Sequence, residues 1–210
     1  IIQVEDAGKQ AAAADRLGFK VTWEGSGAVV RGPDAYDYEL RSQSGMRKEP
    51  FEEIVLTAAN PKALSDWYVD MLHMTLISSS DEGMTVGFRS LTDQQAVHFL
   101  IKKADQNPVK VTQWEGRNAI ALPEAQVRAL NKRILKESPQ LILHEMRELE
   151  EKLGTLVILI LRDPGGFELC VVSSETFDPS VAAATNYEGP DWTQREAFLS
   201  AMSDSTKAEL

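Results

Sequence analysis

Residues 51–74 read FEEIVLTAANPKALSDWYVDMLHM, and this stretch predicts a strand followed at once by a helix. Apolar and polar side chains alternate around Ile54 and Leu56, which is the period of a strand with two different faces. Asn60 offers a side-chain oxygen to the free N–H groups of a starting helix, and Pro61 suits the first helical position. Only packing of this helix on the strand buries its apolar stripe, which comprises Leu64, Trp67, Tyr68 and Met71.

The same pattern occurs twice more along the chain. Residues 116–136 contain the strand sequence RNAIAL, then Pro123 and an amphipathic helix, while a weaker copy opens the chain with IIQVED and an Ala-rich helix. Three further strand-like segments follow each helix, so every unit has the order strand, helix, strand, strand, strand. The three units cover about 1–43, 51–104 and 114–174, with polar linkers between them. This repetition is the main evidence for the fold.

Two segments do not follow the repeat. The charged sequence ELEEKLG at 148–154 could extend a helix, but Gly154 favours a solvated loop. Residues 175–210 predict an acidic C-terminal extension with a short helix over Asp191–Met202. The last residues are expected to be loose.

Composition excludes several classes of function. Of the 210 residues, 43% are hydrophobic and 26% are charged, which is ordinary for a globular protein. The net charge of −10 argues against a nucleic-acid partner, and no apolar run is long enough to span a bilayer. Cys170 is the single cysteine, so no intrachain disulfide can form. We therefore expect an intracellular protein of the cytoplasm or mitochondrion, although the sequence shows no readable leader.

The repeated units resemble the vicinal oxygen chelate superfamily, which includes glyoxalase I, ring-cleaving dioxygenases and fosfomycin resistance proteins. The resemblance lies in NPKALSDWYVDMLHM after a strand and in RDPGGFELCVV at the close of a unit. It implies an α+β fold in which two βαβββ units pair into a cup of eight strands, with helices outside and a divalent metal ion on the concave face. Residues 51–174 would form one such glyoxalase-like domain, and residues 1–43 would be half of an incomplete one. A missing N-terminal unit or another protein chain would complete that first cup, within a larger assembly or a homodimer.

The resemblance also implies two metal-ligand positions in each unit, one early in the first strand and one in the last strand. In the second and third units these positions fall on Glu53, His98, Arg117 and Cys170, where the superfamily typically has Gln, His or Glu. Arg117 is a permanent cation and cannot bind a metal. Cys170 lies in an apolar strand, where a thiol stays protonated. Glu168 is on the same strand face, two residues away, and the site as a whole is degenerate.

Two interpretations of this site stay open. In one, Glu53, His98 and Glu168 bind a divalent ion such as zinc, nickel, magnesium or manganese, with Cys170 as a further candidate ligand. In the other, which we favour, Arg117 pairs with one of the glutamates inside the cup and no metal binds.

The first unit contains a related position. Its sequence GPDAYDYEL resembles the closing turn and strand of the superfamily, with Glu39 at the ligand carboxylate position of an incomplete second site. The other interpretation is a solvent-facing carboxylate. Taken together, the substitutions favour a non-catalytic protein that binds a small molecule or acts as a structural subunit. The alternative is a metal-dependent enzyme similar to lactoylglutathione lyase, acting on a hemithioacetal, in which Glu53 or Glu168 would move the proton.

Overall fold

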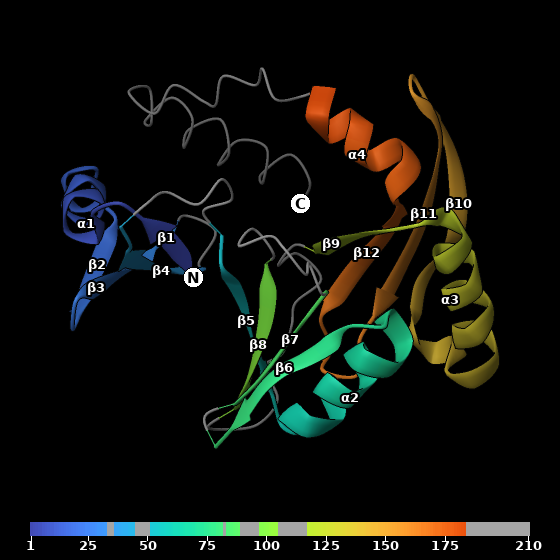
Figure 1. The fold of residues 1–210 in the computed structure, drawn as a ribbon, viewed down its shortest axis with the longest axis horizontal. Coiled ribbons are helices and arrows are strands. Elements are labelled where there is room, and N and C mark those ends of the chain that lie inside the picture. The colour runs from blue at the N-terminus through green and yellow to red at the C-terminus, as the bar shows by residue number, and fades with distance from the viewer. Residues whose placement is uncertain (33–35, 45–50, 82, 89–96, 105–116, 184–210) are drawn as a thin grey trace, which may run out of the picture.

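The computed structural model describes residues 1–32, 36–44, 51–81, 83–88, 97–104 and 117–183 (Figure 1). They form three βαβββ units, so the predicted α+β class and element order are confirmed. The first unit contains β1 (Ile2–Val4), α1 (Ala7–Arg16), β2 (Lys20–Glu24), β3 (Gly27–Arg31) and β4 (Asp37–Ser42). The second contains β5 (Glu53–Ala58), α2 (Pro61–Leu72), β6 (Thr75–Ser80), β7 (Gly83–Gly87) and β8 (His98–Lys103). The third contains β9 (Asn118–Leu122), α3 (Glu124–Glu137), a short 3-10 turn (Pro139–Leu141), β10 (Ile142–Glu151), β11 (Gly154–Arg162) and β12 (Glu168–Ser173), and α4 (Ser174–Ala183) follows it.

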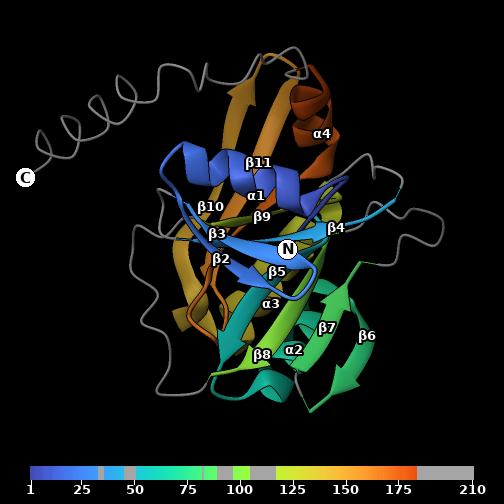
Figure 2. The same ribbon diagram turned by 90° about the vertical axis from the view of Figure 1, so that its left-hand side faces the viewer.

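Each unit folds into one four-stranded sheet with the same strand order. The orders are β1-β4-β3-β2, β5-β8-β7-β6 and β9-β12-β11-β10. In every sheet the first strand runs parallel to the last, and the other neighbours are antiparallel. The helix of the unit covers one face, as α1 does on the first sheet (Figure 2). The first strand of each unit is therefore always an edge strand.

Local sequence explains both ends of α2. The side chain of Asn60 accepts a hydrogen bond from the Ala63 N–H at 3.1 Å, and Pro61 is the first helical residue, as predicted. His73 ends the helix in the left-handed conformation, with φ of 56°, and its N–H donates to the Tyr68 carbonyl. This geometry satisfies one of the carbonyl groups that a helix leaves free at its C-terminus.

The start of α3 is capped from outside its own unit. Pro123 has no side-chain oxygen, so the helix lacks a local cap. Instead, both carboxylate oxygens of Glu175 accept from the Glu124 N–H, at 2.9 and 3.0 Å. Glu175 belongs to α4, so the C-terminal extension begins with a helix that packs on the third unit. The helix expected over Asp191–Met202 lies outside the described residues.

The loop predicted for the charged segment at 148–154 is wrong. β10 continues to Glu151, which pairs with Gly154 across a tight turn, so most of this segment is edge strand. An edge strand with solvent on its outer side accommodates charged side chains on both faces. The charge of the segment therefore reflects exposure, and it does not exclude a strand.

The second and third units share one hydrophobic core. Tyr68 is fully buried, and its hydroxyl donates a 2.5 Å hydrogen bond to Asp163 Oδ2 of the third unit. On the surface, Arg133 of α3 binds Asp70 of α2 at 2.5 Å. The buried members of this core include Leu56, Leu64, Met71, Phe99 and Ile101 from the second unit and Val127, Leu130, Ile134, Leu159 and Leu169 from the third.

The first and second units meet in a different way, through the edges of their sheets. Ile2 and Phe51 form an antiparallel bridge, and the Glu52 N–H donates to the Ile1 carbonyl at 3.0 Å. The Ile1 nitrogen in turn donates to the Glu53 carbonyl at 2.6 Å. Within the described residues, no hydrogen-bonded bridge joins β5 to β9. The contact of the first unit is with residues 51–53, at the start of β5.

Candidate functional site

The strand faces that carry the candidate residues agree with the alternation in the sequence. In β5, Leu56 and Ala58 are buried against the helix, at 3% and 5% exposure, whereas Val55 on the opposite face is 40% exposed. Glu53 shares the face of Val55. Glu53 therefore lies on the sheet face that points away from the core.

Glu53 and His98 lie side by side. They are register partners in the parallel pair β5–β8, and both are half-buried. The ring of His98 lies over Gly87 of the neighbouring strand β7, where an added Cβ would be 2.6 Å from His98 Cδ2. Glycine at this position therefore makes room for the imidazole. The second unit thus presents one carboxylate and one imidazole on adjacent strands.

In the third unit, the predicted ion pair is confirmed. Arg117 Nε donates to Glu168 Oε2 at 2.8 Å, and Arg162 Nη2 lies 3.7 Å from Glu168 Oε1. The Glu168 side chain is only 6% exposed, while that of Arg117 is 42% exposed. Each carboxylate oxygen therefore faces a guanidinium, and the negative charge of Glu168 is balanced within its own sheet.

Cys170 follows on the same strand as Glu168 and is half-buried. Burial raises the pKa of the Cys170 thiol above its ordinary value, and the nearby positive charge of Arg117 acts in the opposite direction. The net increase keeps this thiol protonated at neutral pH. A protonated thiol is a poor metal ligand.

Glu39 of the first unit also has an arginine partner. Arg41 Nε donates to Glu39 Oε1 at 2.7 Å, and Arg41 Nη1 lies 3.9 Å from Glu52 Oε2 of the second unit. Glu53 is close enough to interact electrostatically with the same guanidinium. The structure therefore groups Glu39 with the glutamates at the start of β5, across the edge contact between the first and second units.

The candidate residues fall into two groups. Glu39, Glu53 and His98 lie near the edge contact of the first two units, and Glu168 and Cys170 lie in the third unit beside Arg117. Within the described ranges, no three His, Cys, Asp or Glu side chains come together in a way that could hold a metal ion. Neither Arg41 nor Arg162 was singled out from the sequence, and strand alternation places both on the faces of their glutamate partners.

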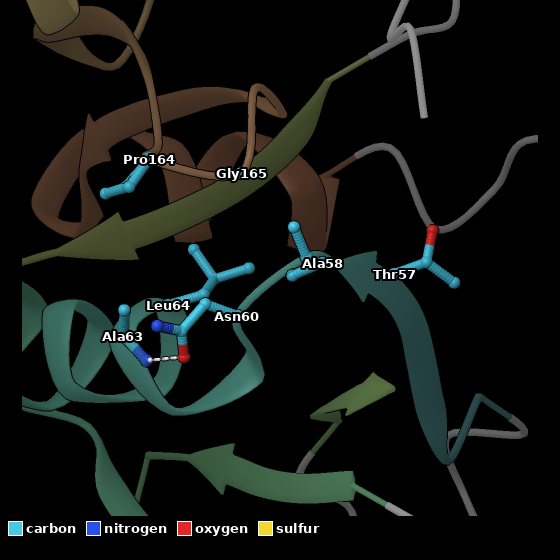
Figure 3. Close-up of a pocket in the computed structure, with 8 residues that line it drawn as sticks. Thr57, Ala58, Asn60, Ala63, Leu64, Pro164 and Gly165 are labelled. Atoms are coloured by element: carbon cyan, nitrogen blue, oxygen red, sulfur yellow. Dashed lines mark hydrogen bonds between the residues drawn. The ribbon is translucent and has the colours of Figure 1, made fainter. Parts of the chain in front are cut away.

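The described residues line a small hollow and a wider one. A small one of about 160 Å³ lies between the start of α2 and the turn before β12 (Figure 3). It is lined by Thr57, Ala58, Ala59, Asn60, Ala63, Leu64, Pro164 and Gly165. A wider one of about 490 Å³ lies on the first sheet. Its lining carries charges of both signs and comprises Lys20, Thr22, Glu24, Val29, Arg31 and Asp37.

Comparison with known proteins identifies the family. The profile of the family described as glyoxalase domain-containing protein 4-like, C-terminal domain, matches residues 60–179. The chain belongs to this family. The match covers the second and third units, and it confirms the resemblance to the vicinal oxygen chelate superfamily and, within it, to glyoxalase domain-containing protein 4. No curated protein sequence matches the chain.

Solved structures support the fold assignment of this glyoxalase domain-containing protein 4-like chain. A variant of glyoxalase I from Zea mays is 19% identical, with a TM-score of 0.61, and the match covers 85% of this chain and 68% of the maize chain. A second variant of the maize enzyme is also 19% identical, with a TM-score of 0.56 and coverage of 86% and 68%. At this identity the likeness concerns the fold alone. None of the described helices has the length and apolar character needed to cross a membrane.

Proposed function

We propose that this chain is a non-catalytic glyoxalase-like protein that serves as a structural or ligand-binding subunit. The observation that carries the proposal is the engagement of Glu168 by Arg117 at 2.8 Å and by Arg162 at 3.7 Å. A metal ion needs free carboxylate lone pairs, and it is repelled by a guanidinium that cannot lose its proton. Glu168 is nearly buried, so separating it from its partners would leave an uncompensated charge in the protein.

The first unit supports the same proposal independently. Its candidate ligand carboxylate, Glu39, is bound by Arg41 at 2.7 Å. The two ligand-type carboxylates that close a unit, Glu39 and Glu168, are thus each paired with an arginine of their own unit. Within the described residues, the candidate ligands Glu53 and His98 make no hydrogen bond to an arginine. Two protein ligands fall short of the three that catalytic metal sites commonly use.

A second function is favoured by one specific observation, the register pairing of Glu53 with His98. A metal-dependent lyase acting on a hemithioacetal would use these two residues and a third ligand. The metal would polarise a substrate oxygen, and a glutamate would transfer the proton. For Glu168 to be that third ligand, it would have to leave Arg117. For Glu39 to be that ligand, it would have to leave Arg41.

The two functions differ in metal content and in turnover. The purified chain, equilibrated with zinc, nickel or manganese ions and then desalted, should retain well below one ion per chain by elemental mass spectrometry. It should not convert a glutathione hemithioacetal. The matched variant Arg117→Gln releases Glu168 and should raise metal retention above that of the native chain. Retention of about one ion by the native chain, lost in His98→Ala, would replace the structural proposal with the lyase.

A further inference from the structure

Three carboxylates meet one guanidinium at the junction of the first two units, which comprises β1 and residues 51–53. Arg41 Nε donates to Glu39 Oε1 at 2.7 Å, and Arg41 Nη1 lies 3.9 Å from Glu52 Oε2. Glu53 interacts electrostatically with the same guanidinium. Glu39 and Arg41 lie on β4 of the first unit, and the other two glutamates lie at the start of the second unit. One positive charge is therefore shared by carboxylates of both units.

Two further side chains with free electron pairs belong to the same junction. Gln3 lies on β1 in register with Arg41, so the two side chains are on the same sheet face. The side-chain oxygen of Gln3 is buried, and within the described residues it accepts no hydrogen bond. His98 is the register partner of Glu53. Carboxylate oxygen, amide oxygen and imidazole nitrogen are all ligands of divalent metal ions. The junction therefore contains the donor types of a cation site.

A metal ion does not fit these donors while Arg41 is present. The guanidinium engages the carboxylate of Glu39, keeps its proton at physiological pH and repels a second cation nearby. Within the ranges that the structure describes, no three His, Cys, Asp or Glu side chains are placed to hold an ion. The cation at the junction is therefore a side chain of the protein itself.

The way in which the two units meet explains why this charge matters. The hydrophobic cluster of the first unit and that of the other two units have no buried residue in common. At the junction, the N–H groups of Glu52 and Glu53 donate to the Ile1 carbonyl. The glutamates beside such a backbone contact would repel one another if no cation neutralised them. Arg41 therefore joins acidic groups of two units, as a bridging metal ion does.

We propose that Arg41 is the resident cation of the junction and stands in the place of a divalent ion. Removing its charge should open a divalent-cation site, whose ligands are Gln3, Glu39, Glu53 and His98. Zinc or manganese ions match these oxygen and imidazole donors. The inference rests on the proposed non-catalytic function, but it concerns the junction and not the Arg117–Glu168 pair, so different variants test the two.

Isothermal titration calorimetry with zinc ions and, separately, manganese ions tests this assignment. The Arg41 side chain is 46% exposed, so Arg41→Met should stay folded, which circular dichroism checks. The variant should bind one ion per chain at least about tenfold more tightly than the native chain, because a repulsive unit charge is gone. Adding Glu39→Gln to Arg41→Met should abolish this gain.

Arg31→Met is the matched control. Arg31 lies on the same face of the first sheet and binds Asp37 at 2.9 Å, so its replacement also frees a carboxylate. Within the described residues, no ion pair joins Arg31 to the second unit. Arg31→Met should therefore bind zinc and manganese no more tightly than the native chain does. Arg41→Lys keeps the positive charge and should likewise show no gain.

Hydrogen exchange reports on the junction without measuring metal binding itself. The Glu52 N–H donates to the Ile1 carbonyl, and the His98 N–H donates to the Glu52 carbonyl, both at 3.0 Å. In Arg41→Met these two amides should exchange faster than in the native chain, and zinc should slow their exchange again. In the native chain, zinc should leave the exchange of both amides unchanged.

The outcomes separate this inference from the proposed function. A folded Arg41→Met variant with the metal affinity of the native chain overturns the role of Arg41 and leaves the proposed function intact. A native chain that binds one ion and loses it in Glu39→Gln overturns both. An ion that the native chain loses in Glu168→Gln instead overturns the proposed function alone.

Discussion

The second unit contacts its two neighbours in opposite ways. Toward the third unit it contributes helix and strand side chains to one continuous core, with Tyr68 and Leu64 among the most buried residues. Toward the first unit it offers backbone groups at a strand edge, and the side chains nearby are the charged residues Arg41, Glu52 and Glu53. The contact with the third unit stabilises the fold through buried apolar side chains. The contact with the first unit leaves polar side chains accessible at a sheet edge, where binding chemistry is possible.

Disrupting the packed contact should have the largest effect. Leu64 is 2% exposed, and its Cδ2 atom lies 3.0 Å from the position of a Cβ added at Gly165 in the third unit. Leu64→Ala should lower the free energy of unfolding by about 2–5 kcal/mol, because it removes buried methyl groups and leaves a cavity. Urea denaturation measures this change. Leu135→Ala on α3, at a side chain that is 54% exposed, is the matched control and should cost less than about 0.5 kcal/mol.

The hydrogen bond within the same contact should matter next. Tyr68→Phe keeps the ring, which packs edge-on against Phe99 with centroids 5.1 Å apart, and removes only the donor to Asp163. We expect a loss of about 1–3 kcal/mol, since a buried acceptor loses one of its partners. A double-mutant cycle with Asp163→Asn should show coupling between the two positions. Additive effects would mean that the hydroxyl and the carboxylate do not act as a pair.

Asp163 should also make this contact depend on pH. Burial raises the pKa of Asp163 above its ordinary value of 3.8. Hydrogen bonds from Tyr68 and the backbone of Phe167 lower this pKa, but the effect of burial is larger. The folded state therefore holds the proton to higher pH than the unfolded state. This contribution to stability is complete below pH 3.8 and is lost as the pH rises through the pKa of the folded protein. As the pH rises across that window, the free energy of unfolding of the native chain should fall relative to that of Asp163→Asn. Parallel pH profiles of the unfolding free energy for the two proteins would contradict this prediction.

The polar sites allow a sharper comparison between two arginine–glutamate pairs. Glu168 is 6% exposed and Glu39 is 34% exposed, although the distances to Arg117 and Arg41 are nearly equal. Arg117→Met should cost about 1–3 kcal/mol, because it removes the nearer cation from a buried carboxylate. Arg162 at 3.7 Å limits the loss. Thermal unfolding at low and high salt measures it, and a salt-independent cost is expected of a buried group.

Much of this fold follows from sequence alone. The alternation in β5 and the residues Asn60 and Pro61 predict the strand faces and the start of α2, because these signals act between neighbours in the chain. The Glu175 cap on α3 joins residues 51 positions apart, and no local pattern encodes such a contact.

The contact of the first unit with the second could not be predicted for a related reason. All three units carry the same pattern, so the sequence does not distinguish which two first strands meet. The structure places the edge contact between β1 and residues 51–53 at the start of β5, and the shared core between the second and third units. The candidate residues Glu53 and His98 were predicted as neighbours and are register partners. Their association with Glu39, rather than with Glu168, depends on the edge contact and was missed.

The smallest effect is expected at Arg41. Its guanidinium joins Glu39 at 2.7 Å and Glu52 at 3.9 Å, but all three side chains are partly exposed, so water and salt screen their charges. Arg41→Met should therefore change the free energy of unfolding by no more than about 1 kcal/mol, and the change should shrink at high salt. The same thermal unfolding at low and high salt that measures Arg117→Met serves here. Equal costs for the two variants would show that burial of the glutamate does not decide the strength of these pairs. That result would remove the main argument that Glu168 is held too firmly to bind a metal.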